Sequence, residues 1–505
     1  MRKWEKVTSS EARVPREAVA RFQNRLERER CLIHGFAMLD KGKLLAEEYY
    51  APFTADTLHR MFSVGKSFVS LAIGLLQDDG KLSLDDCICD YFTDKAKVAG
   101  AECRYVPEES DSKIYPYEEM HPWLRKLTIR QMLSMTTCHG KTTYKLFDGD
   151  WVESFFRIRP TNLPGAVFSY DTSSTHVLSA LVEKLSSMKL IEYLRLKAFD
   201  KIGFSKEAYY MPDPAGVSQG GSGLNCKLLD LLAVAELVLN EGVYEGEQLL
   251  PRDYLKEATS FQISTQQQPA YDEQLGYGYQ IWRGRHDCFY CYGIGGQLAV
   301  CLPKEQFILV TMGNTLENKN GIKCIFDAFF EEIYPYLGEN CRCGAEDAQN
   351  PGRAQISSGM LRGKVSVPAA GKLPEVPVDV ISTPKHFVNG KEYVFETNML
   401  EVSKLQLCLE DGNGKLYMVK EGKLFDLRFG LETYGKTTFP WTGAECHCQG
   451  TWVMEDMFFI RCYILGPDMA NLYICLRFTE DGVTVKMTKG ADDMMKNFEG
   501  VASGE

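Results

Sequence analysis

The segment at residues 62–76 reads FSVGKSFVSLAIGLL and constrains the fold more than any other part of the chain. Its apolar residues recur at three- and four-residue spacing, which predicts a buried or half-buried helix. The sequence Asp78-Asp79-Gly80 follows, and a glycine at this place is typical of a helix end. We therefore expect the rest of the chain to be organised around this helix.

Ser63 and Lys66 form a Ser-x-x-Lys pair where this helix begins. Residues three apart share one face of a helix, with about 5–6 Å between their Cβ atoms, so both side chains can point into one pocket. The unpaired N–H groups and the positive dipole end of the first turn favour developing negative charge on the serine. Apolar surroundings disfavour the ammonium form of the lysine. The pair is therefore a candidate nucleophile with its proton acceptor.

The same spacing occurs elsewhere in the chain, so the pattern alone proves little. None of the other instances opens a long apolar helix: they are Ser110/Lys113 in a polar, acidic loop, Ser186/Lys189 near the end of a helical pattern, and Ser382/Lys385 in a proline-rich segment.

Composition places the chain among ordinary globular proteins, because 45% of its 505 residues are hydrophobic and 25% are charged. This length predicts two to four domains. The net charge of −11 disfavours nucleic acid and anionic membrane as partners. The first 30 residues lack the apolar region of a secretory signal, and no apolar run approaches the ~18 residues of a membrane span. We expect a cytoplasmic protein.

The cysteine pattern suggests neither a disulfide framework nor a metal site. Seventeen cysteines in a long chain without a signal favour reduced thiols. Cys288 and Cys291 form a Cys-x-x-Cys pair, but they fall in a predicted strand, where residues three apart face opposite sides of the sheet. No second Cys or His pair has zinc-like spacing, so we expect no metal and no cofactor.

The N-terminal two thirds of the chain predict an α/β (α+β) domain over residues 1–340. Residues 16–29 have helical spacing, and residues 31–53 contain two short apolar runs joined by Asp40-Lys41-Gly42, a hairpin signal. Further strands are expected at 277–282, at 289–302 with glycine interruptions, and at 307–312, followed by a helix at 321–334. Together they predict an antiparallel sheet flanked by helices, with a helical subdomain at about 90–215.

The remaining chain divides into a linker and a second domain. Residues 341–384 are rich in Gly, Pro, Ala and Ser without a clear period, which indicates a linker. Residues 385–505 contain short alternating runs separated by Asp-Gly, Glu-Gly and Gly-Pro turns. This pattern predicts an all-β barrel or sandwich, in which we identify no catalytic motif.

Two further segments follow the Ser-x-x-Lys pair in a set order. Tyr170-x-Thr172 lies in a tight loop just before a predicted helix, whose start is marked by a Ser/Thr/Asp cluster at 171–175. A glycine-broken strand, YGIGG, covers 292–296. By itself, a tyrosine before a helix is usually a packed turn residue. His139 follows a short helix capped by Thr128, and we interpret it as a loop histidine.

Taken in order, these segments resemble the serine β-lactamase and penicillin-binding-protein superfamily. The most similar branch contains class C β-lactamase-like esterases, D-aminopeptidases and 6-aminohexanoate-dimer hydrolases. The resemblance rests on HRMFSVGKSFVSLAIGLL, GKLSLDD, LTIRQMLSMTT, PGAVFSYDTSSTHVLSALVEKL and YGIGGQLAVCLP, and covers about residues 30–335. No Gly-x-Ser-x-Gly is present, which disfavours an α/β-hydrolase.

The resemblance implies roles for individual residues. Ser63 is the nucleophile, Lys66 its proton acceptor or relay, and Tyr170 the general base and then the acid. The backbone N–H groups of Ser63 and Ile294 form the oxyanion hole. The substrate is bound by four other residues, Thr172, Tyr292, Gly293 and Gly295.

Two departures from the family pattern bear on the substrate. Thr172 stands where the family has asparagine, and Cys291-Tyr292-Gly293 stands where the family has Lys-Thr-Gly. The missing lysine helps to hold the substrate carboxylate in the family, so β-lactam hydrolysis is disfavoured. Arg283, Arg285 and His286 are nearby in sequence and could substitute for it, although exposed hairpin residues are the simpler interpretation.

Two hypotheses follow. In the first, the chain is a serine hydrolase that works through an acyl-enzyme on a small ester, amide or D-amino-acid-containing peptide. In the second, it is a catalytically idle protein that binds cell-wall-like peptides or a protein partner. The complete set of Ser63, Lys66 and Tyr170 favours the enzyme.

Overall fold

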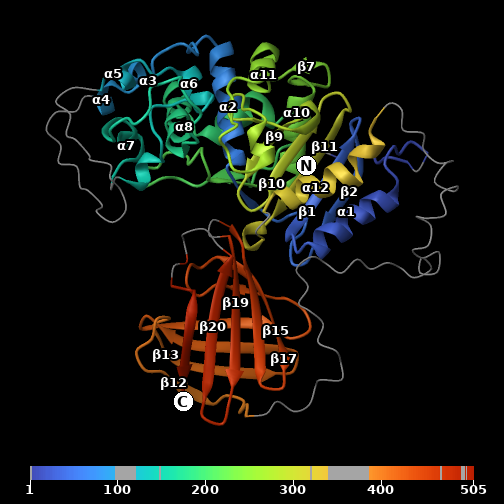
Figure 1. The fold of residues 1–505 in the computed structure, drawn as a ribbon, viewed down its shortest axis with the longest axis vertical. Helices are drawn as coiled ribbons and strands as arrows, with labels where there is room; N and C mark the ends of the chain where they lie inside the picture. Colours follow the sequence, from blue (N-terminus) through green and yellow to red (C-terminus); the bar gives the residue numbers. More distant parts are fainter. Residues whose placement is uncertain are drawn as a thin grey trace.

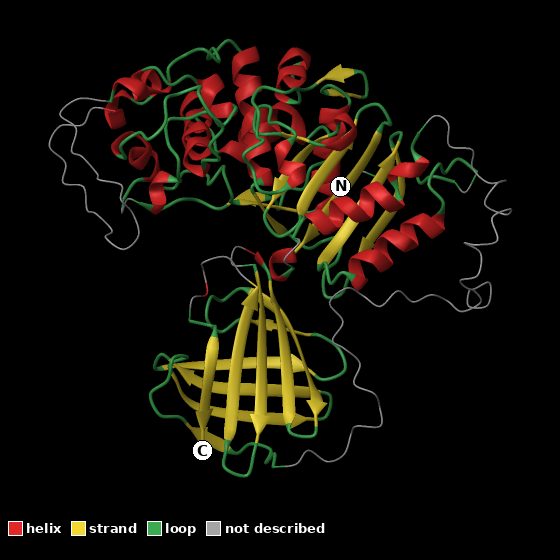
Figure 2. Ribbon diagram, viewed as in Figure 1, coloured by secondary structure: helices red, strands yellow, loops and turns green. Residues whose placement is uncertain are grey.

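The computed structural model describes residues 3–8, 10–96, 121–146, 149–318, 321–338, 386–466, 469–490, 495 and 497–505. It contains an α/β part, which carries the helices, and a C-terminal β part (Figures 1 and 2). This is the mixed architecture that the sequence predicts.

A six-stranded antiparallel sheet, in the order β2-β1-β11-β10-β9-β8, forms the centre of the α/β part. The hairpin predicted at 40–42 is confirmed, because β1 pairs with β2 on either side of it. β1 also pairs with β11, so the two ends of this part meet in the middle of the sheet (Figure 1). The strands are β1 (Ile33–Asp40), β2 (Lys43–Tyr49), β8 (Trp282–Arg283), β9 (Phe289–Gly293), β10 (Gln297–Leu302) and β11 (Phe307–Gly313).

Helices cover both faces of this sheet, and the strand sequences show why. Side chains alternate between faces along a strand. Phe36 and Met38 of β1 belong to one apolar cluster, with α1 (Arg16–Arg28) and α12 (Lys323–Glu332). Ala37 and Leu39 belong to the other, with α2 (Val64–Asp78) and α10 (Leu228–Leu239). Both faces are therefore apolar and both are buried.

Short helices form the region predicted as a helical subdomain. Thr128 begins one of them with a capping box to Gln131, which confirms the predicted cap. The helices here are α3 (Ile88–Tyr91), α4 (Thr93–Ala96), α5 (Pro122–Arg125), α6 (Ile129–Leu133), α7 (Trp151–Arg157), α8 (Thr172–Ser186) and α9 (Leu190–Leu194). Near its end lies β4 (Tyr209–Tyr210), and outside it lie β3 (His59–Phe62), β5 (Leu224–Cys226), β6 (Val243–Tyr244), β7 (Glu247–Gln248) and α11 (Arg252–Ala258).

Two strand predictions need correction. The single strand expected at 289–302 is a hairpin of β9 and β10, because Gly295 and Gly296 have φ of +88° and +90° and reverse the chain between them. The strand expected at 277–282 contains only Trp282 at its end, since β8 is Trp282–Arg283.

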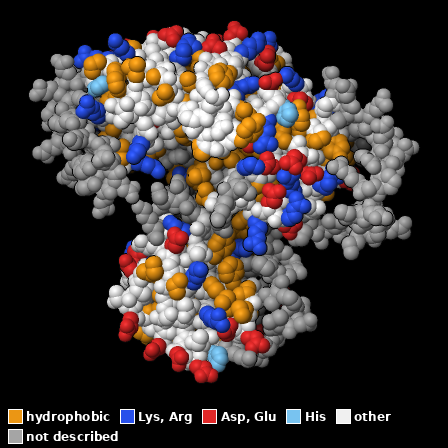
Figure 3. All heavy atoms as spheres, in the orientation of Figure 1, with side chains coloured by type: hydrophobic (Ala, Val, Ile, Leu, Met, Phe, Trp, Pro, Cys, Tyr) orange, Lys and Arg blue, Asp and Glu red, His pale blue; other side chains and the backbone are white. Residues whose placement is uncertain are grey.

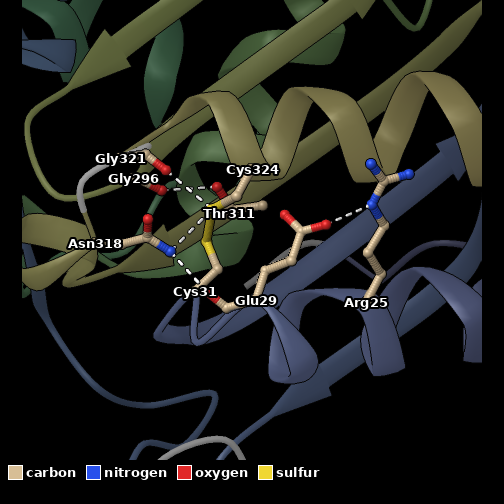
Figure 4. Close-up of a disulfide and its surroundings, with 8 residues drawn as sticks. All are labelled: Arg25, Glu29, Cys31, Gly296, Thr311, Asn318, Gly321 and Cys324. Carbon is tan, nitrogen blue, oxygen red and sulfur yellow. Dashed lines mark hydrogen bonds and ion pairs between the residues drawn. A yellow bond between two sulfur atoms is a disulfide. The ribbon is translucent and has the colours of Figure 1, made fainter.

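The expectation of reduced thiols is wrong for one pair of cysteines. Cys31, just before β1, is disulfide-bonded to Cys324 in α12, with a Cα–Cα distance of 6.6 Å (Figure 4). Asn318 Nδ2 donates a hydrogen bond to the carbonyl oxygen of Glu29 at 2.8 Å beside this bond. The two cysteines are 293 residues apart in sequence, so only the folded sheet brings them together.

The C-terminal part is a nearly closed β barrel in which neighbouring strands are antiparallel, apart from one parallel pair. Its strand order is β12-β13-β14-β15-β17-β18-β19-β20-β21, with β16 on β17, and a bridge from Phe395 to Gly504 joins the two ends. Apolar side chains fill its interior. The strands are β12 (Glu392–Val394), β13 (Val402–Glu410), β14 (Asn413–Lys420), β15 (Lys423–Gly430), β16 (Gly435–Thr438), β17 (Glu445–Met454), β18 (Met457–Ile464), β19 (Ala470–Phe478), β20 (Val483–Gly490) and β21 (Gly500–Gly504).

The barrel packs against the α/β part at one end. The Tyr463 ring lies edge-on to Phe53 and His34, with centroid distances of 5.6 and 5.9 Å. Asn314, just after β11, donates a hydrogen bond from Nδ2 to the carbonyl oxygen of Gly490 at 2.8 Å. On the face drawn in Figure 3, basic and acidic side chains are interspersed over both parts. The linker predicted at 341–384 lies outside the described residues.

Candidate active site

Ser63 is the N-cap residue of α2, directly after β3. The residue before it, Phe62, has φ of +46°, an unusual left-handed conformation for a bulky side chain. On the other side, a Cβ at Gly293 would lie 2.1 Å from the carbonyl oxygen of Met61, so only glycine allows the end of β9 to approach this backbone. The end of β9 therefore lies beside the chain that leads into Ser63.

Lys66 lies in the first turn of α2 and is buried, with 1% of its surface exposed. Its Nζ donates hydrogen bonds to Ser63 Oγ at 2.9 Å and to the carbonyl oxygen of Gly221 at 2.6 Å. Burial lowers the pKa of Lys66 to about 7, and the charge of Asp171 offsets this only in part. A substantial fraction of Lys66 is therefore a neutral amine near pH 7, able to accept a proton.

Tyr170 completes this cluster from the loop before α8. Its ring stacks on Trp282 with a centroid distance of 5.8 Å, and Lys66 Nζ lies 5.0 Å from the ring centroid. Burial raises the pKa of Tyr170 above its usual value, and a side-chain hydrogen bond with Ser63 offsets part of the rise. Tyr170 is therefore protonated at neutral pH.

Asp171, between Tyr170 and Thr172, is a buried residue that our sequence analysis did not single out. It caps α8 by accepting hydrogen bonds from the backbone N–H groups of Ser173 at 2.9 Å and Ser174 at 3.2 Å. Burial raises its pKa to about 6. The Ser/Thr/Asp cluster did predict this cap, and the structure adds that the capping carboxylate acts electrostatically on Lys66.

Thr172 and the loop at 215–224 close the site from another side. A Cβ at Gly221 would lie 2.4 Å from Thr172 Cγ2, so the glycine lets this loop bring its carbonyl oxygen to Lys66. Thr172 itself is half-buried, at the first position of α8.

The turn between β9 and β10 carries the other predicted binding residues. Tyr292 is half-buried, and the Ile294 side chain is 39% exposed. Gln297 Nε2 donates hydrogen bonds to the carbonyl oxygens of Ile294 at 3.0 Å and Gly313 at 2.8 Å, which hold the turn in place. Gly295 has a left-handed conformation in this turn. The turn begins directly after Gly293, which lies against the Met61 backbone.

Other candidates lie outside this cluster. His139 is buried, and its Nε2 is hydrogen-bonded to the carbonyl oxygen of Phe155 at 2.8 Å. Ser186 Oγ donates to the carbonyl oxygen of Met188, whereas Lys189 pairs with Glu183. The pairs Ser110/Lys113 and Ser382/Lys385 lie outside the described residues.

Of the basic residues near β8, His286 is exposed as we expected, whereas Arg283 and Arg285 are not. Arg285 is half-buried and forms ion pairs with Asp272 at 2.6 Å and Asp327 at 2.9 Å. Arg283 is half-buried too and donates to the carbonyl oxygen of Thr259 at 2.9 Å. These contacts use both guanidinium groups away from Ser63.

Our sequence analysis also missed Glu273, which lies in the short 3₁₀ turn Tyr271–Gln274. Its charge raises the pKa of both Tyr170 and Tyr292, so it is electrostatically close to the site. No motif marks this loop in the sequence.

Within the described ranges, no cluster of three or more His, Cys, Asp or Glu side chains could hold a metal ion. Within them, too, no helix is long and apolar enough to cross a membrane.

Comparison with known proteins identifies the family. The model of the family described as "Beta-lactamase" matches residues 20–325, and the chain therefore belongs to that family. A 6-aminohexanoate-dimer hydrolase from Paenarthrobacter ureafaciens is 24% identical over 239 residues, which cover 46% of this chain and 58% of the relative. The chain thus spans less than two thirds of the length of this curated relative.

One solved structure shares the fold of the α/β part, and a second is reported beside it. A family VIII carboxylesterase superposes with a TM-score of 0.50 at 12% identity, covering 64% of this chain and 97% of the other. A penicillin-binding protein homologue from Caulobacter crescentus has a TM-score of 0.49 at 15% identity, covering 64% of this chain and 98% of the other. The superfamily expected from the sequence motifs is confirmed.

Proposed function

We propose that the protein is a serine hydrolase that forms an acyl-enzyme on Ser63 while cleaving a small ester, amide or D-amino-acid-containing peptide. The observation that carries this proposal is the 2.9 Å contact between Ser63 Oγ and the buried Nζ of Lys66. A serine hydroxyl is a weak nucleophile until an adjacent base accepts its proton. The lowered pKa of Lys66 supplies that base near neutral pH.

In the acylation step, Ser63 Oγ attacks the carbonyl carbon of the substrate while its proton passes to Lys66 Nζ. The backbone N–H groups of Ser63 and Ile294 stabilise the resulting oxyanion. When the tetrahedral intermediate collapses, the bond to the leaving group breaks and the leaving atom takes the proton of the Tyr170 hydroxyl, which Lys66 replaces with the proton it received from Ser63. Water then attacks the acyl carbon with Lys66 as base, which releases the acid and restores Ser63.

This assignment revises the role first implied for Tyr170. A phenolate base requires a lowered pKa, whereas burial raises the pKa of Tyr170. Lys66 has the opposite shift and the direct hydrogen bond to Ser63. We therefore assign the base to Lys66 and proton donation to Tyr170.

The substrate class follows from what surrounds the serine. Cys291 stands where the family pattern has a lysine, and the arginines near β8 are engaged elsewhere, so a substrate carboxylate has no evident partner there. The similarity to a 6-aminohexanoate-dimer hydrolase and to the fold of a carboxylesterase supports esters and amides. We propose that β-lactams are poor substrates.

The test is a panel of p-nitrophenyl esters, D-aminoacyl amides and nitrocefin, assayed with the wild-type protein and with Ser63→Ala. We expect turnover of at least one ester or amide that Ser63→Ala abolishes, and little turnover of nitrocefin. Ser63-independent turnover would contradict the mechanism. An active-site phosphonate probe that leaves the serine unmodified would favour the idle, peptide-binding alternative.

A further inference from the structure

A small cavity lies on the face of β9 that carries Tyr290 and Tyr292. Its volume is about 50 Å³, and Glu273, Lys323 and Phe326 contribute to its wall. A cavity of about 10–15 Å³ on the same measure holds one water molecule, so this space accepts a small polar group rather than a whole substrate. Four aromatic side chains line it, those of Tyr271, Tyr290, Tyr292 and Phe326, and aromatic faces attract cations.

The charged groups around this cavity are paired, except for one. Asp272 is bound by Arg285 at 2.6 and 2.8 Å, and Lys323 pairs with Asp327. Glu273 is half-buried, and within the described chain its carboxylate forms no hydrogen bond and no ion pair with another side chain. A partly buried carboxylate without a partner is unfavourable unless a cation or a hydrogen-bond donor satisfies it.

The cavity is also close to the reacting groups. Tyr292 lines the cavity and directly precedes Gly293, which approaches the Met61 backbone that leads into Ser63, and the charge of Glu273 acts on Tyr170 as well as on Tyr292. A group bound here would therefore be part of the same molecule whose carbonyl meets Ser63.

We propose that Glu273, with Tyr290 and Tyr292, binds an ammonium group of the substrate, so that the enzyme selects esters or amides that carry a primary amine near the scissile carbonyl. This inference rests on the proposed function and names its substrate class. It also gives the site the opposite charge preference to a pocket built around a lysine, which this chain lacks at position 291.

The test compares p-nitrophenyl esters whose acyl chains end in ammonium, methyl or carboxylate, over several chain lengths. A second set carries the same three groups on the phenol. We expect the ammonium ester of at least one set to have the highest kcat/KM. Glu273→Gln should lower that kcat/KM about 10-fold or more, since a hydrogen bond to a charged group contributes about 1.5–3 kcal/mol, and should change the methyl ester little.

Two more variants sharpen the result. Glu273→Lys should reverse the preference toward the carboxylate ester. Glu245→Gln, in the exposed turn between β6 and β7, is the matched control and should leave all three substrates unchanged. Circular dichroism establishes that each variant is folded.

A second readout needs no turnover. Butylammonium should slow phosphonylation of Ser63 in the wild-type protein and in Glu245→Gln, but not in Glu273→Gln, whereas butanol should protect none of them. Equal protection in all three proteins, or equal effects of Glu273→Gln on all three esters, would overturn the ammonium site while leaving the serine mechanism intact. Turnover that survives Ser63→Ala would instead overturn the proposed function.

Discussion

The start of helix α2 and the end of barrel strand β14 each bury a lysine completely, and the two lysines are held differently. Lys420 donates from Nζ to the carbonyl oxygen of Leu400 at 2.6 Å, pairs with Glu421 at 3.3 Å and lies 5.0 Å from the Phe498 ring centroid. Among the residues that the structure describes, Lys66 has no carboxylate partner within hydrogen-bonding distance, and it instead contacts the Ser63 hydroxyl and one carbonyl oxygen. A buried cation that is only partly compensated is costly to the fold.

The burial of the neighbouring residues also differs between the two lysines. In β14, buried positions alternate with more accessible, mostly half-buried ones, as expected for a strand with one face in a core. At the start of α2, every position from Val64 to Leu76 is buried, polar residues included, and the chain enters from the left-handed Phe62. These features cost stability, and the catalytic role that we propose for Ser63 and Lys66 accounts for them.

Of the variants considered, Lys66→Met should lower kcat the most. Removing the base should lower kcat for an ester or amide by about 10²–10⁴-fold. Lys420→Met is the matched control, because it removes an equally buried lysine from the barrel, and it should lower the thermal midpoint while leaving kcat unchanged. Comparable losses of kcat in both folded variants would mean that activity follows stability rather than Lys66.

Lys66 should also leave a signature in the stability of the protein. Its pKa is about 7 in the folded protein and about 10.4 in an unfolded chain. Between these pH values the unfolded chain binds more protons, so the free energy of unfolding rises with pH across this window. Urea denaturation should show this rise in the wild-type protein and a smaller one in Lys66→Met.

Tyr170→Phe should separate amides from activated esters. The change removes the hydroxyl and keeps the ring on Trp282. The thermal midpoint should therefore stay near that of the wild type, and the free energy of unfolding should fall by only about 1 kcal/mol. We expect kcat for an amide to fall at least ~10²-fold, because its leaving nitrogen needs a proton. A p-nitrophenyl ester should be affected less. Unchanged amide turnover would assign proton donation to another group.

The pH profile should then distinguish the two bases. With Lys66 as base, kcat/KM rises as pH increases, bends near 7 and stays level above it, since the pKa of Lys66 is about 7. A Tyr170 phenolate would give a profile that continues to rise well above this pH, because burial raises its pKa.

Changes in the barrel should have the smallest effect on catalysis. A protein that ends before residue 386 should keep most of its turnover of a small ester, because every group of the proposed mechanism precedes it. Tyr463→Ala should lower the free energy of unfolding by about 3 kcal/mol, as for other large buried aromatics, without changing kcat. A truncated protein that folds but has lost all turnover would show that the barrel shapes the site.

Sequence patterns predicted the elements whose causes are local. The apolar spacing of α2, the Thr128 cap and the hairpin at 40–42 each depend on a few neighbouring residues, and the structure confirms them. The order of the motifs also predicted the superfamily. These features could be recognised without knowing which distant segments meet.

What the sequence could not predict depends on contacts between distant segments. The Cys31–Cys324 disulfide and the contact of Gly221 with Lys66 join residues that only the folded chain brings together. Glu273 belongs to no sequence motif. It stands out only because the charged residues around it, Asp272 and Lys323, form ion pairs with other residues. The pKa directions that favour Lys66 over Tyr170 likewise result from burial, which spacing does not reveal.

Covalent labelling tests the central claim most directly. After treatment with a serine-reactive phosphonate, peptide mass spectrometry should place the adduct on Ser63 alone, and Lys66→Met should slow its formation. The Ser63→Ala protein should remain unlabelled. An adduct on Ser110, Ser186 or Ser382, or equal labelling of the Ser63→Ala protein, would contradict the account.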